Sequence, residues 1–366
     1  MTELIKKIAS HFLIEGEVID VDSHVNGLVN KTFLVYTINA CKKHRYVIQK
    51  INQFVFPNPD KLMENIVKVT NHIKNKQTND ETLTVVWTKD GKSYYQEDNQ
   101  SFRCYQYLNN SVNYNTLKNI QQFKEVGRAV GRFQKQLADF CACDLYPIIP
   151  DFHHTPKRYL KFLEVLPYAS NERLFNSRDE QQFVSDHHSD LLLIQEQLDK
   201  QKIPIRVTHN DTKLNNVMFD ETTDRALCLI DLDTVMPGTV LFDFGDALRV
   251  GASSTAEDDP IIENVDFDLK KFIAFTLGFL EESKNRLTPN EYDLLADSVY
   301  IITMECGIRF LTDYLANDIY FLTHYPNHNL VRAKNQFQLA KKIKKALPDM
   351  RKIIKIIKER YLPAKD

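Results

Sequence analysis

The distribution of strand and helix patterns along the chain constrains its fold most. Within residues 1–108, segments rich in β-branched and aromatic residues, such as VIDVD, KTFLVYTI, HRYVIQKI and TLTVVWT, are typical of β-strands. They surround one helical pattern, PDKLMENIVKVTNHIKN, which has Pro59 and Asp60 at its start and apolar residues at helical spacing. This order predicts a small antiparallel sheet with a single helix.

Beyond about residue 110 the pattern becomes helical. We expect helices over residues 117–140, 156–168, 178–201, 266–285, 289–316 and 331–346. One short β-rich segment, residues 206–235, interrupts them. The sequence therefore predicts an α+β fold with two lobes, a small β-rich N-lobe over residues 1–108 and a larger, mainly helical C-lobe over residues 109–366.

Composition excludes several classes of function. The 366 residues carry a net charge of -2, so no overall field favours nucleic acid or an anionic membrane. No apolar run approaches the roughly 18 residues of a membrane span. The six cysteines are scattered and predict reduced thiols in a cytoplasmic protein. Cys141 and Cys143 are the one close pair, and they lack the two further ligands of a zinc site.

The segment His209–Asn216, HNDTKLNN, has the spacing of a kinase catalytic loop. Such a loop needs a carboxylate that takes the proton of a hydroxyl acceptor and, five residues later, an oxygen ligand for Mg²⁺. Asp211 and Asn216 stand at that spacing, and Lys213 is placed to steady the γ-phosphate of ATP. The alternative is a polar turn between two strands.

The next apolar strand, ALCLIDLDTV, ends in two aspartates. The metal-binding aspartate of a kinase follows such a strand, and Mg²⁺ prefers oxygen ligands. Asp231 is the first candidate for this ligand and Asp233 the second, although Asp233 is equally suited to capping the following turn. Together with the catalytic loop, this strand predicts an enzyme that binds Mg²⁺ and ATP.

Three segments, THNDTKLNNVMFD, IDLDTVMPG and FDFGDALRVGASSTAEDD, resemble the aminoglycoside phosphotransferase-like kinase superfamily, and within it most closely the N-acetylhexosamine 1-kinases. The resemblance extends over residues 17–340. It implies a bilobal protein-kinase-like fold, ATP between the lobes, Asp211 as catalytic base and Asp231 as metal ligand. It also implies that Arg309 and Tyr320 contact the sugar. From the residues alone, Arg309 could equally be a surface side chain and Tyr320 a core residue.

The N-lobe leaves one choice open. A kinase places a lysine on its third strand to bind the ATP phosphates, and YVIQKIN offers Gln49 and Lys50, which point to opposite faces of a strand. The register favours Gln49, whereas charge favours Lys50. Glu64 on the following helix is either the partner of that lysine or an exposed side chain. In the segment CYQYLNN, the backbone near Gln106 and Leu108 is expected to bind adenine.

One turn departs from the family pattern, because Leu28 and Lys31 replace its usual histidine and acid. The acceptor predicted here is the anomeric hydroxyl of an N-acetylhexosamine. A kinase of the same fold acting on an aminoglycoside, choline, homoserine or another hexose stays an alternative, as does a nucleotide-binding pseudokinase. The basic C-terminus disfavours a polycationic acceptor. His153 and the acidic run that begins at Glu257 are expected at the surface.

Overall fold

The computed structural model describes residues 2–25, 29–76, 81–283 and 286–361, which form two compact units. The N-terminal unit contains the chain up to Val112 together with Cys143–Ile149 and Met218–Met236. The C-terminal unit contains Asn113–Ala142, Pro150–Val217 and Pro237 onward. The sequence placed a single boundary after residue 108, whereas in the structure two later segments return to the N-terminal unit.

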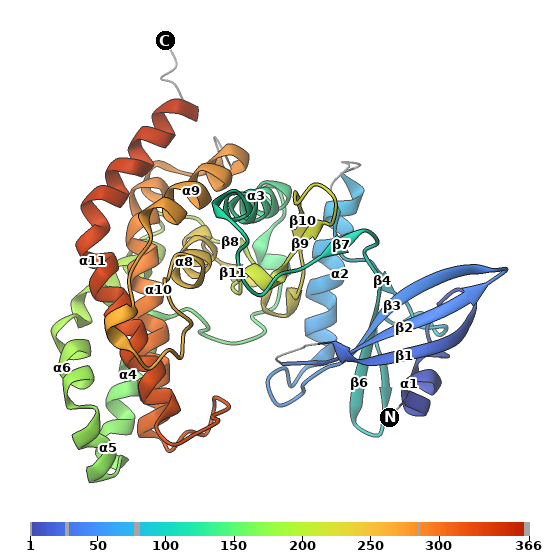
Figure 1. The fold of residues 1–366 in the computed structure, drawn as a ribbon, viewed down its shortest axis with the longest axis horizontal. Coiled ribbons are helices and arrows are strands. Elements are labelled where there is room, and N and C mark those ends of the chain that lie inside the picture. The colour runs from blue at the N-terminus through green and yellow to red at the C-terminus, as the bar shows by residue number, and fades with distance from the viewer. Residues whose placement is uncertain (1, 26–28, 77–80, 284–285, 362–366) are drawn as a thin grey trace. The chain divides into compact units, whose positions relative to one another are not determined.

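The N-terminal unit is built on a six-stranded antiparallel sheet (Figure 1). The strand order is β1-β2-β3-β6-β4, and β5 pairs with β6. The strands are β1 (Glu17–Val25), β2 (Lys31–Asn39), β3 (Lys42–Lys50), β4 (Val85–Val86), β5 (Tyr95–Glu97) and β6 (Gln100–Gln106). Nearly all of these strands fall within the segments predicted from their β-branched and aromatic residues.

Two helices accompany this sheet. Helix α1 (Thr2–Ala9) buries Ile5 and Ile8 against one face of the sheet, where they pack with Phe33, Tyr46 and Ile48. Helix α2 (Pro59–Asn75) has the bounds that its apolar spacing predicts. Its N-terminus is capped by the Asn58 side chain, which accepts a hydrogen bond from the backbone of Lys61.

Short strands complete the β-structure. β7 (Ser111–Val112), β9 (Val217–Asp220) and β10 (Ala226–Leu229) form a three-stranded sheet in the order β10-β9-β7. β8 (Arg206–Thr208) pairs with β11 (Met236–Gly238). This is the β-rich interruption expected over residues 206–235.

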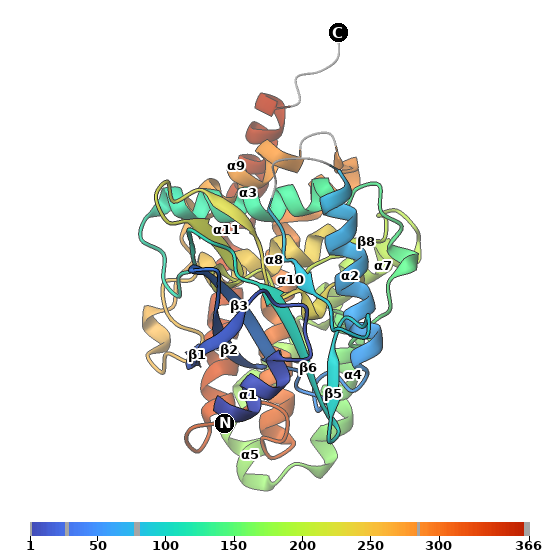
Figure 2. The same ribbon diagram turned by 90° about the vertical axis from the view of Figure 1, so that its right-hand side faces the viewer.

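The C-terminal unit is mainly helical (Figure 2). Helices α3 and α9 approach closely, because a side-chain carbon at Gly127 or Gly278 would meet a backbone carbonyl oxygen of the other helix at 2.1 or 2.0 Å. The helices are α3 (Ile120–Gln136), α4 (Thr155–Val165), α5 (Asn171–Asn176), α6 (Arg178–Asp186), α7 (Leu193–Asp199), α8 (Val240–Gly251), α9 (Leu269–Ser283), α10 (Pro289–Leu315) and α11 (His328–Tyr361).

The structure differs from the helix predictions in several places, and the short helix α5 is one that was not predicted. The helix expected over 178–201 is divided into α6 and α7 by a 3₁₀ turn at His188–Leu192. Helix α8 was not predicted, and every residue from Val240 to Arg249 is buried. Its short sequence includes two glycines, Gly245 and Gly251, which are poor helix formers, so the helical signal is weak.

The fold class is confirmed: the protein is α+β, with an antiparallel sheet in the N-terminal unit and a helical C-terminal unit. Among the described residues, no helix is both long enough and apolar enough to cross a bilayer.

Candidate active site

The predicted catalytic loop follows β8 in the C-terminal unit. His209 is completely buried, and its ring meets the ring of Phe133 edge-on with 5.8 Å between centroids. The next residue, Asn210, has a left-handed backbone with φ of 64°. Asparagine tolerates this conformation better than most residues. Asp211 follows Asn210 in the loop, and a quarter of its side chain is exposed.

Three of the predicted residues come together in this loop. The Asn216 amide Nδ2 donates to the Asp211 carboxylate Oδ2 at 2.9 Å and to the Asp211 carbonyl at 2.8 Å. Lys213 Nζ lies 2.7 Å from Asp211 Oδ1. The Asp211 carboxylate, followed by Asp246, raises the pKa of Lys213 above its ordinary value, so the ammonium stays charged. The loop thus presents one carboxylate held between an amide and a cation.

The loop is held in place by Asp243 of α8, a residue to which the sequence analysis gave no role. Its carboxylate accepts the backbone N–H groups of His209 at 3.0 Å and Asn210 at 2.7 Å, and the Gln134 amide at 2.8 Å. Burial raises the pKa of Asp243, while the neighbouring His209 ring and these donors act in the opposite direction. The segment FDFGDALRVG contains Asp243, but nothing in its local pattern marks an aspartate that accepts N–H groups of a loop more than 30 residues away.

A second carboxylate of α8 supports the same loop. Asp246 accepts the backbone N–H of Thr212 at 3.0 Å and pairs with Arg249 at 2.9 Å. Arg249 also contacts Glu257 at 2.5 Å. Although burial opposes its charge, Arg249 holds the pKa of Glu257 below its usual range, and Lys213 adds to this effect. Glu257 was expected in a solvated loop; its side chain is 37% exposed, and its carboxylate also belongs to this charged network.

The predicted metal turn belongs to the N-terminal unit, directly after β10. Asp231 has a left-handed backbone, with φ of 60° and ψ of 58°, and is half-buried. Asp233 is only 3% exposed. One of its carboxylate oxygens pairs with the guanidinium of Arg103, and the other accepts the Asn30 amide at 2.5 Å. The two aspartates therefore differ: Asp233 is held by side chains of the sheet, and Asp231 is the more exposed.

Helix α2 supports the turn from a second direction. The Asn65 side chain is completely buried and donates to the carbonyl oxygens of Val235 at 2.9 Å and Tyr146 at 2.8 Å. Its oxygen accepts the backbone N–H of Tyr146 at 2.9 Å. A left-handed residue other than glycine costs on the order of 1 kcal/mol or more, and such contacts over-determine its conformation.

Strand alternation separates Gln49 from Lys50. Lys50 is opposite Phe102 in the β3–β6 register, and Phe102 belongs to the core under α1. Gln49 is opposite Arg103 and accepts a hydrogen bond from its Nε at 2.9 Å. Gln49 therefore lies on the face of the sheet that meets the metal turn, and Lys50 lies on the other face.

Glu64 of α2, considered as a partner for a strand lysine, is exposed and pairs with Lys68 at 2.7 Å on its own helix. This is the second of the two interpretations that the sequence allowed. The charged pair of strand lysine and helix glutamate that protein kinases use is therefore absent from these positions.

The predicted adenine-binding backbone follows β6. Gln106 ends the strand, and its N–H donates to the Thr84 carbonyl at 2.9 Å. The carbonyl of Leu108 accepts the Ser111 hydroxyl at 2.6 Å. Within the described part of the chain, the N–H of Leu108 donates to no other residue.

The two predicted sugar contacts lie in the C-terminal unit. The Arg309 guanidinium of α10 lies over the rings of Phe152 and Phe321, at 5.3 and 5.5 Å from their centroids. Tyr320 is 54% exposed, and its ring meets that of Phe321 edge-on at 4.9 Å. Burial is the main cause that lowers the pKa of Arg158, and the positive charge of Arg309 lowers it further. Two arginines and three aromatic rings therefore form one cluster at this surface.

His153 was expected at the surface, and this expectation is wrong. It is 9% exposed, and its Nδ1 lies 2.8 Å from Glu305 Oε1. Its Nε2 lies 3.5 Å from the carbonyl oxygen of Asn210 in the catalytic loop. Glu305 is buried on α10, and Thr155 donates to its other oxygen at 2.5 Å. The pair joins α10 to the catalytic loop, and a lone histidine in the sequence gives no signal of such a partner.

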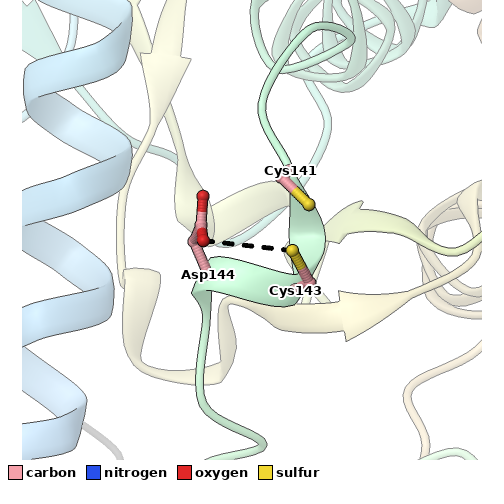
Figure 3. A group of neighbouring side chains, drawn as sticks. All are labelled: Cys141, Cys143 and Asp144. Atoms are coloured by element: carbon pink, nitrogen blue, oxygen red, sulfur yellow. Dashed lines mark hydrogen bonds between the residues drawn. The ribbon is translucent and has the colours of Figure 1, made fainter.

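One group of possible metal ligands lies elsewhere. Cys141, Cys143 and Asp144 are neighbours on an exposed segment (Figure 3). The two cysteines are joined as a disulfide, which corrects the prediction that all six thiols are reduced. Sulfurs that share a disulfide are not available as thiolate ligands, and no described histidine, cysteine or acid supplies a fourth ligand. The group therefore has no metal-binding role here.

Two residues, Leu28 and Lys31, depart from the family pattern, and the structure describes only the second of them. Leu28 lies among the residues that the structure does not describe. Lys31 is exposed at the start of β2.

Comparison with known proteins agrees with this geometry. Residues 31–272, about two thirds of the chain, match the model of the phosphotransferase enzyme family known as APH. The chain therefore belongs to this family of phosphotransferases. The match covers strands β2 to β6 of the N-terminal sheet, the predicted catalytic loop, the predicted metal turn and α8, and it leaves out β1.

Solved structures with the same fold share little sequence with this chain. A microcompartment-associated aminopropanol kinase is 14% identical, with a TM-score of 0.65 over 95% of this chain and 98% of that one. An aminoglycoside phosphotransferase from Alicyclobacillus acidocaldarius is 13% identical, with a TM-score of 0.62 over 96% of each chain. Spectinomycin phosphotransferase APH(9)-Ia, solved with ADP and spectinomycin, is 12% identical, with a TM-score of 0.57 over 95% and 98%. These likenesses establish the fold.

Proposed function

We propose that the protein is an ATP-dependent kinase that phosphorylates the anomeric hydroxyl of an N-acetylhexosamine. The observation that carries the phosphoryl transfer is the arrangement of Asp211 between Asn216 and Lys213. In this proposal the Asp211 carboxylate accepts the proton of the attacking hydroxyl. Lys213 remains charged and stabilises the negative charge that develops on the transferred phosphoryl group.

The donor set of the proposed metal site fits Mg²⁺. The Asn216 amide nitrogen is used in bonds to Asp211, and no described residue donates to the amide oxygen, Oδ1. We propose the Asp231 carboxylate as the Mg²⁺ ligand that the N-terminal unit supplies, and Asn216 Oδ1, in the C-terminal unit, is a hard oxygen of the kind that Mg²⁺ also takes. When bound, Mg²⁺ neutralises charge on the ATP phosphates. We assign Asp233, the second candidate ligand, mainly to holding the turn, because both of its oxygens already have partners.

For the nucleotide, we assign adenine to the backbone at Gln106 and Leu108. The N–H of Leu108, which donates to no other residue in the described part of the chain, is the donor that we assign to the adenine ring. Of the two candidate phosphate contacts, Gln49 rather than Lys50 shares a face with the metal turn. The strand therefore places an uncharged amide where kinases place a lysine.

The acceptor-side cluster favours a neutral, hydroxyl-rich substrate over a cationic one. Choline, amino alcohols and aminoglycosides carry positive charge, and sites for quaternary ammonium use open aromatic faces. Here the faces of Phe152 and Phe321 are covered by the Arg309 guanidinium, and Arg158 adds a second positive charge. Both would repel a cation. They suit the hydroxyl and acetamide oxygens of a sugar, with the Tyr320 ring as an apolar face.

The test is a substrate panel followed by product analysis. Purified protein is incubated with Mg²⁺, ATP and either N-acetylglucosamine, N-acetylgalactosamine, unmodified hexoses, choline or an aminoglycoside, and ADP release is measured. Asp211→Asn protein serves as the background control. We expect turnover with an N-acetylhexosamine and a phosphorus NMR signal coupled to the anomeric proton. Turnover only with a cationic acceptor, or phosphate on another hydroxyl, would contradict the sugar assignment while leaving the kinase assignment intact.

A further inference from the structure

The N-terminal unit contains a buried arginine whose role the catalytic residues do not explain. The side chain of Arg103 on β6 is 1% exposed. Burying a guanidinium is costly unless it is paired, and arginine does not lose its charge at neutral pH. Its Nη1 pairs with Asp233, and its Nε donates to Gln49 Oε1 at 2.9 Å. The arginine is therefore fixed at two points.

The contacts of Arg103 continue into a wider network. The Gln49 amide donates to the Thr32 hydroxyl at 3.0 Å. The second oxygen of Asp233 accepts the Asn30 amide at 2.5 Å, and the Asn30 oxygen accepts the backbone N–H of Asn52 at 2.9 Å. Strands β2, β3 and β6 are thus tied through polar side chains to the turn that carries Asp231 and Asp233.

Electrostatics are consistent with a fixed positive charge at this place. Burial opposes the charge on Arg103, but the nearby carboxylate of Asp233, together with that of Asp231, raises its pKa above the ordinary value of arginine. The ion pair itself is made by Asp233, two residues after Asp231.

This pairing stands where protein kinases have a different one. Their strand lysine pairs with a helix glutamate, and the pair must form for the ATP phosphates to be bound correctly. Here the strand position is Gln49, Lys50 is on the opposite face, and Glu64 of α2 pairs with Lys68. The one buried cation on this face, within the described part of the sheet, is Arg103, on the neighbouring strand.

We propose that Arg103 replaces the lysine–glutamate pair as the positioning residue of this enzyme: by holding Asp233, it fixes Asp231 in its left-handed turn and so sets the affinity for Mg²⁺ and ATP. The inference rests on the proposed kinase function. Arg103 acts through Asp233 rather than by contact with the reacting atoms. When a residue that holds a metal ligand in place is lost, the metal affinity typically falls by about 10- to 100-fold.

The experiment measures ATP affinity with and without Mg²⁺ by calorimetry, in the wild-type protein and in Arg103→Lys and Arg103→Gln. The ratio of the two affinities is the Mg²⁺ effect. We expect it to fall by about tenfold or more in both variants, while the acceptor KM changes little. Arg128→Lys is the matched control, because it weakens a partly buried pair with Glu281 in the C-terminal unit. It should lower the thermal midpoint and leave the Mg²⁺ effect unchanged.

The outcomes separate the two proposals. A wild-type protein whose ATP affinity does not respond to Mg²⁺ would contradict the proposed function itself. A normal wild-type response that persists in folded Arg103 variants, or that falls equally in Arg128→Lys, would overturn only the role of Arg103. If both Arg103 variants fail to fold, Gln49→Met decides, because it removes the acceptor of Arg103 Nε from a half-buried position. A reduced Mg²⁺ effect in Gln49→Met supports the inference, and an unchanged one overturns it.

Discussion

The proposed catalytic loop (His209–Asn216) and the proposed metal turn (Asp231–Asp233) are stabilised by side chains of opposite charge. Each contains a left-handed residue, Asn210 in the loop and Asp231 in the turn. The loop is held by an anion, because the buried carboxylate of Asp243 accepts its backbone N–H groups. The turn is held by a cation, because Arg103 pairs with the Asp233 side chain.

The difference determines what each support controls. Asp243 binds main-chain atoms directly beside Asp211, so its loss should move the catalytic carboxylate whatever metal is present. Arg103 binds a side chain two residues after Asp231, so its loss should act on metal affinity first. Variants of the two regions should therefore separate into a class that loses turnover and a class that loses the response to Mg²⁺.

The largest effect is expected from Asp211→Asn. The substitution keeps the shape of the side chain and removes the proton acceptor, so kcat should fall by about 100-fold or more, in line with the contribution of a positioned general base. ATP affinity should be preserved, because the base acts on the acceptor hydroxyl. Steady-state kinetics and nucleotide titration measure the two quantities. A variant with near-normal kcat would remove Asp211 from this role.

Asp231→Ala tests the proposed metal turn. Loss of the carboxylate should remove the Mg²⁺-dependent part of ATP binding and with it nearly all turnover, since the metal shields the phosphate charge. Asn216→Ala should act in the same direction and more weakly, because a neutral amide binds Mg²⁺ less strongly than a carboxylate. Calorimetric titrations with and without Mg²⁺ check this. If the Mg²⁺ effect survives Asp231→Ala, the metal assignment is wrong.

Asp243→Ala tests how the buried carboxylate stabilises the proposed catalytic loop. It leaves the N–H groups of His209 and Asn210 and the Gln134 amide buried without their acceptor, which should lower the free energy of unfolding by about 3 kcal/mol or more. The matched control is Asp220→Ala. Asp220 also accepts two backbone N–H groups, from Thr222 and Thr223, but in an exposed turn where water replaces it.

Denaturant unfolding compares these two variants, and kcat is measured for each that folds. Asp243→Ala should lose turnover while its Mg²⁺ effect on ATP affinity is retained. If Asp243→Ala and Asp220→Ala lower the free energy of unfolding equally, burial of the Asp243 carboxylate is not what makes it stabilise the loop.

Arg309→Ala tests the acceptor cluster and should have a more moderate effect. Loss of a charged hydrogen-bond donor should raise the acceptor KM by roughly tenfold and leave the KM for ATP nearly unchanged. Arg309→Lys should recover part of the loss, since it restores the charge without the planar donor group. An increase in both KM values, or in that for ATP alone, would place Arg309 outside the acceptor site.

The smallest effect is expected from Lys50→Met. The side chain lies on the α1 face of the sheet, away from the metal turn, so the KM for ATP should change by less than about twofold, as for a surface substitution. The same kinetic assay measures it. A large increase in the KM for ATP would show that Lys50, and not the network around Arg103, binds the phosphates.

The sequence by itself determined the features that depend on neighbouring residues. The strand patterns and the bounds of α2 follow from local periodicity. The spacing of Asp211, Lys213 and Asn216 is local as well, and the structure brings these three residues together. A catalytic loop can be read in this way because its functional groups lie within a few residues of one another.

Only the tertiary structure decided the contacts between distant residues. Arg103 and Asp233 are 130 positions apart, and nothing local marks either as the partner of the other. The same holds for His153 with Glu305 and for Asp243 of helix α8 with the backbone of His209 and Asn210. The choice between Gln49 and Lys50 needed the register of β3 on β6, because alternation fixes that the two residues differ in face but not which face meets the metal turn.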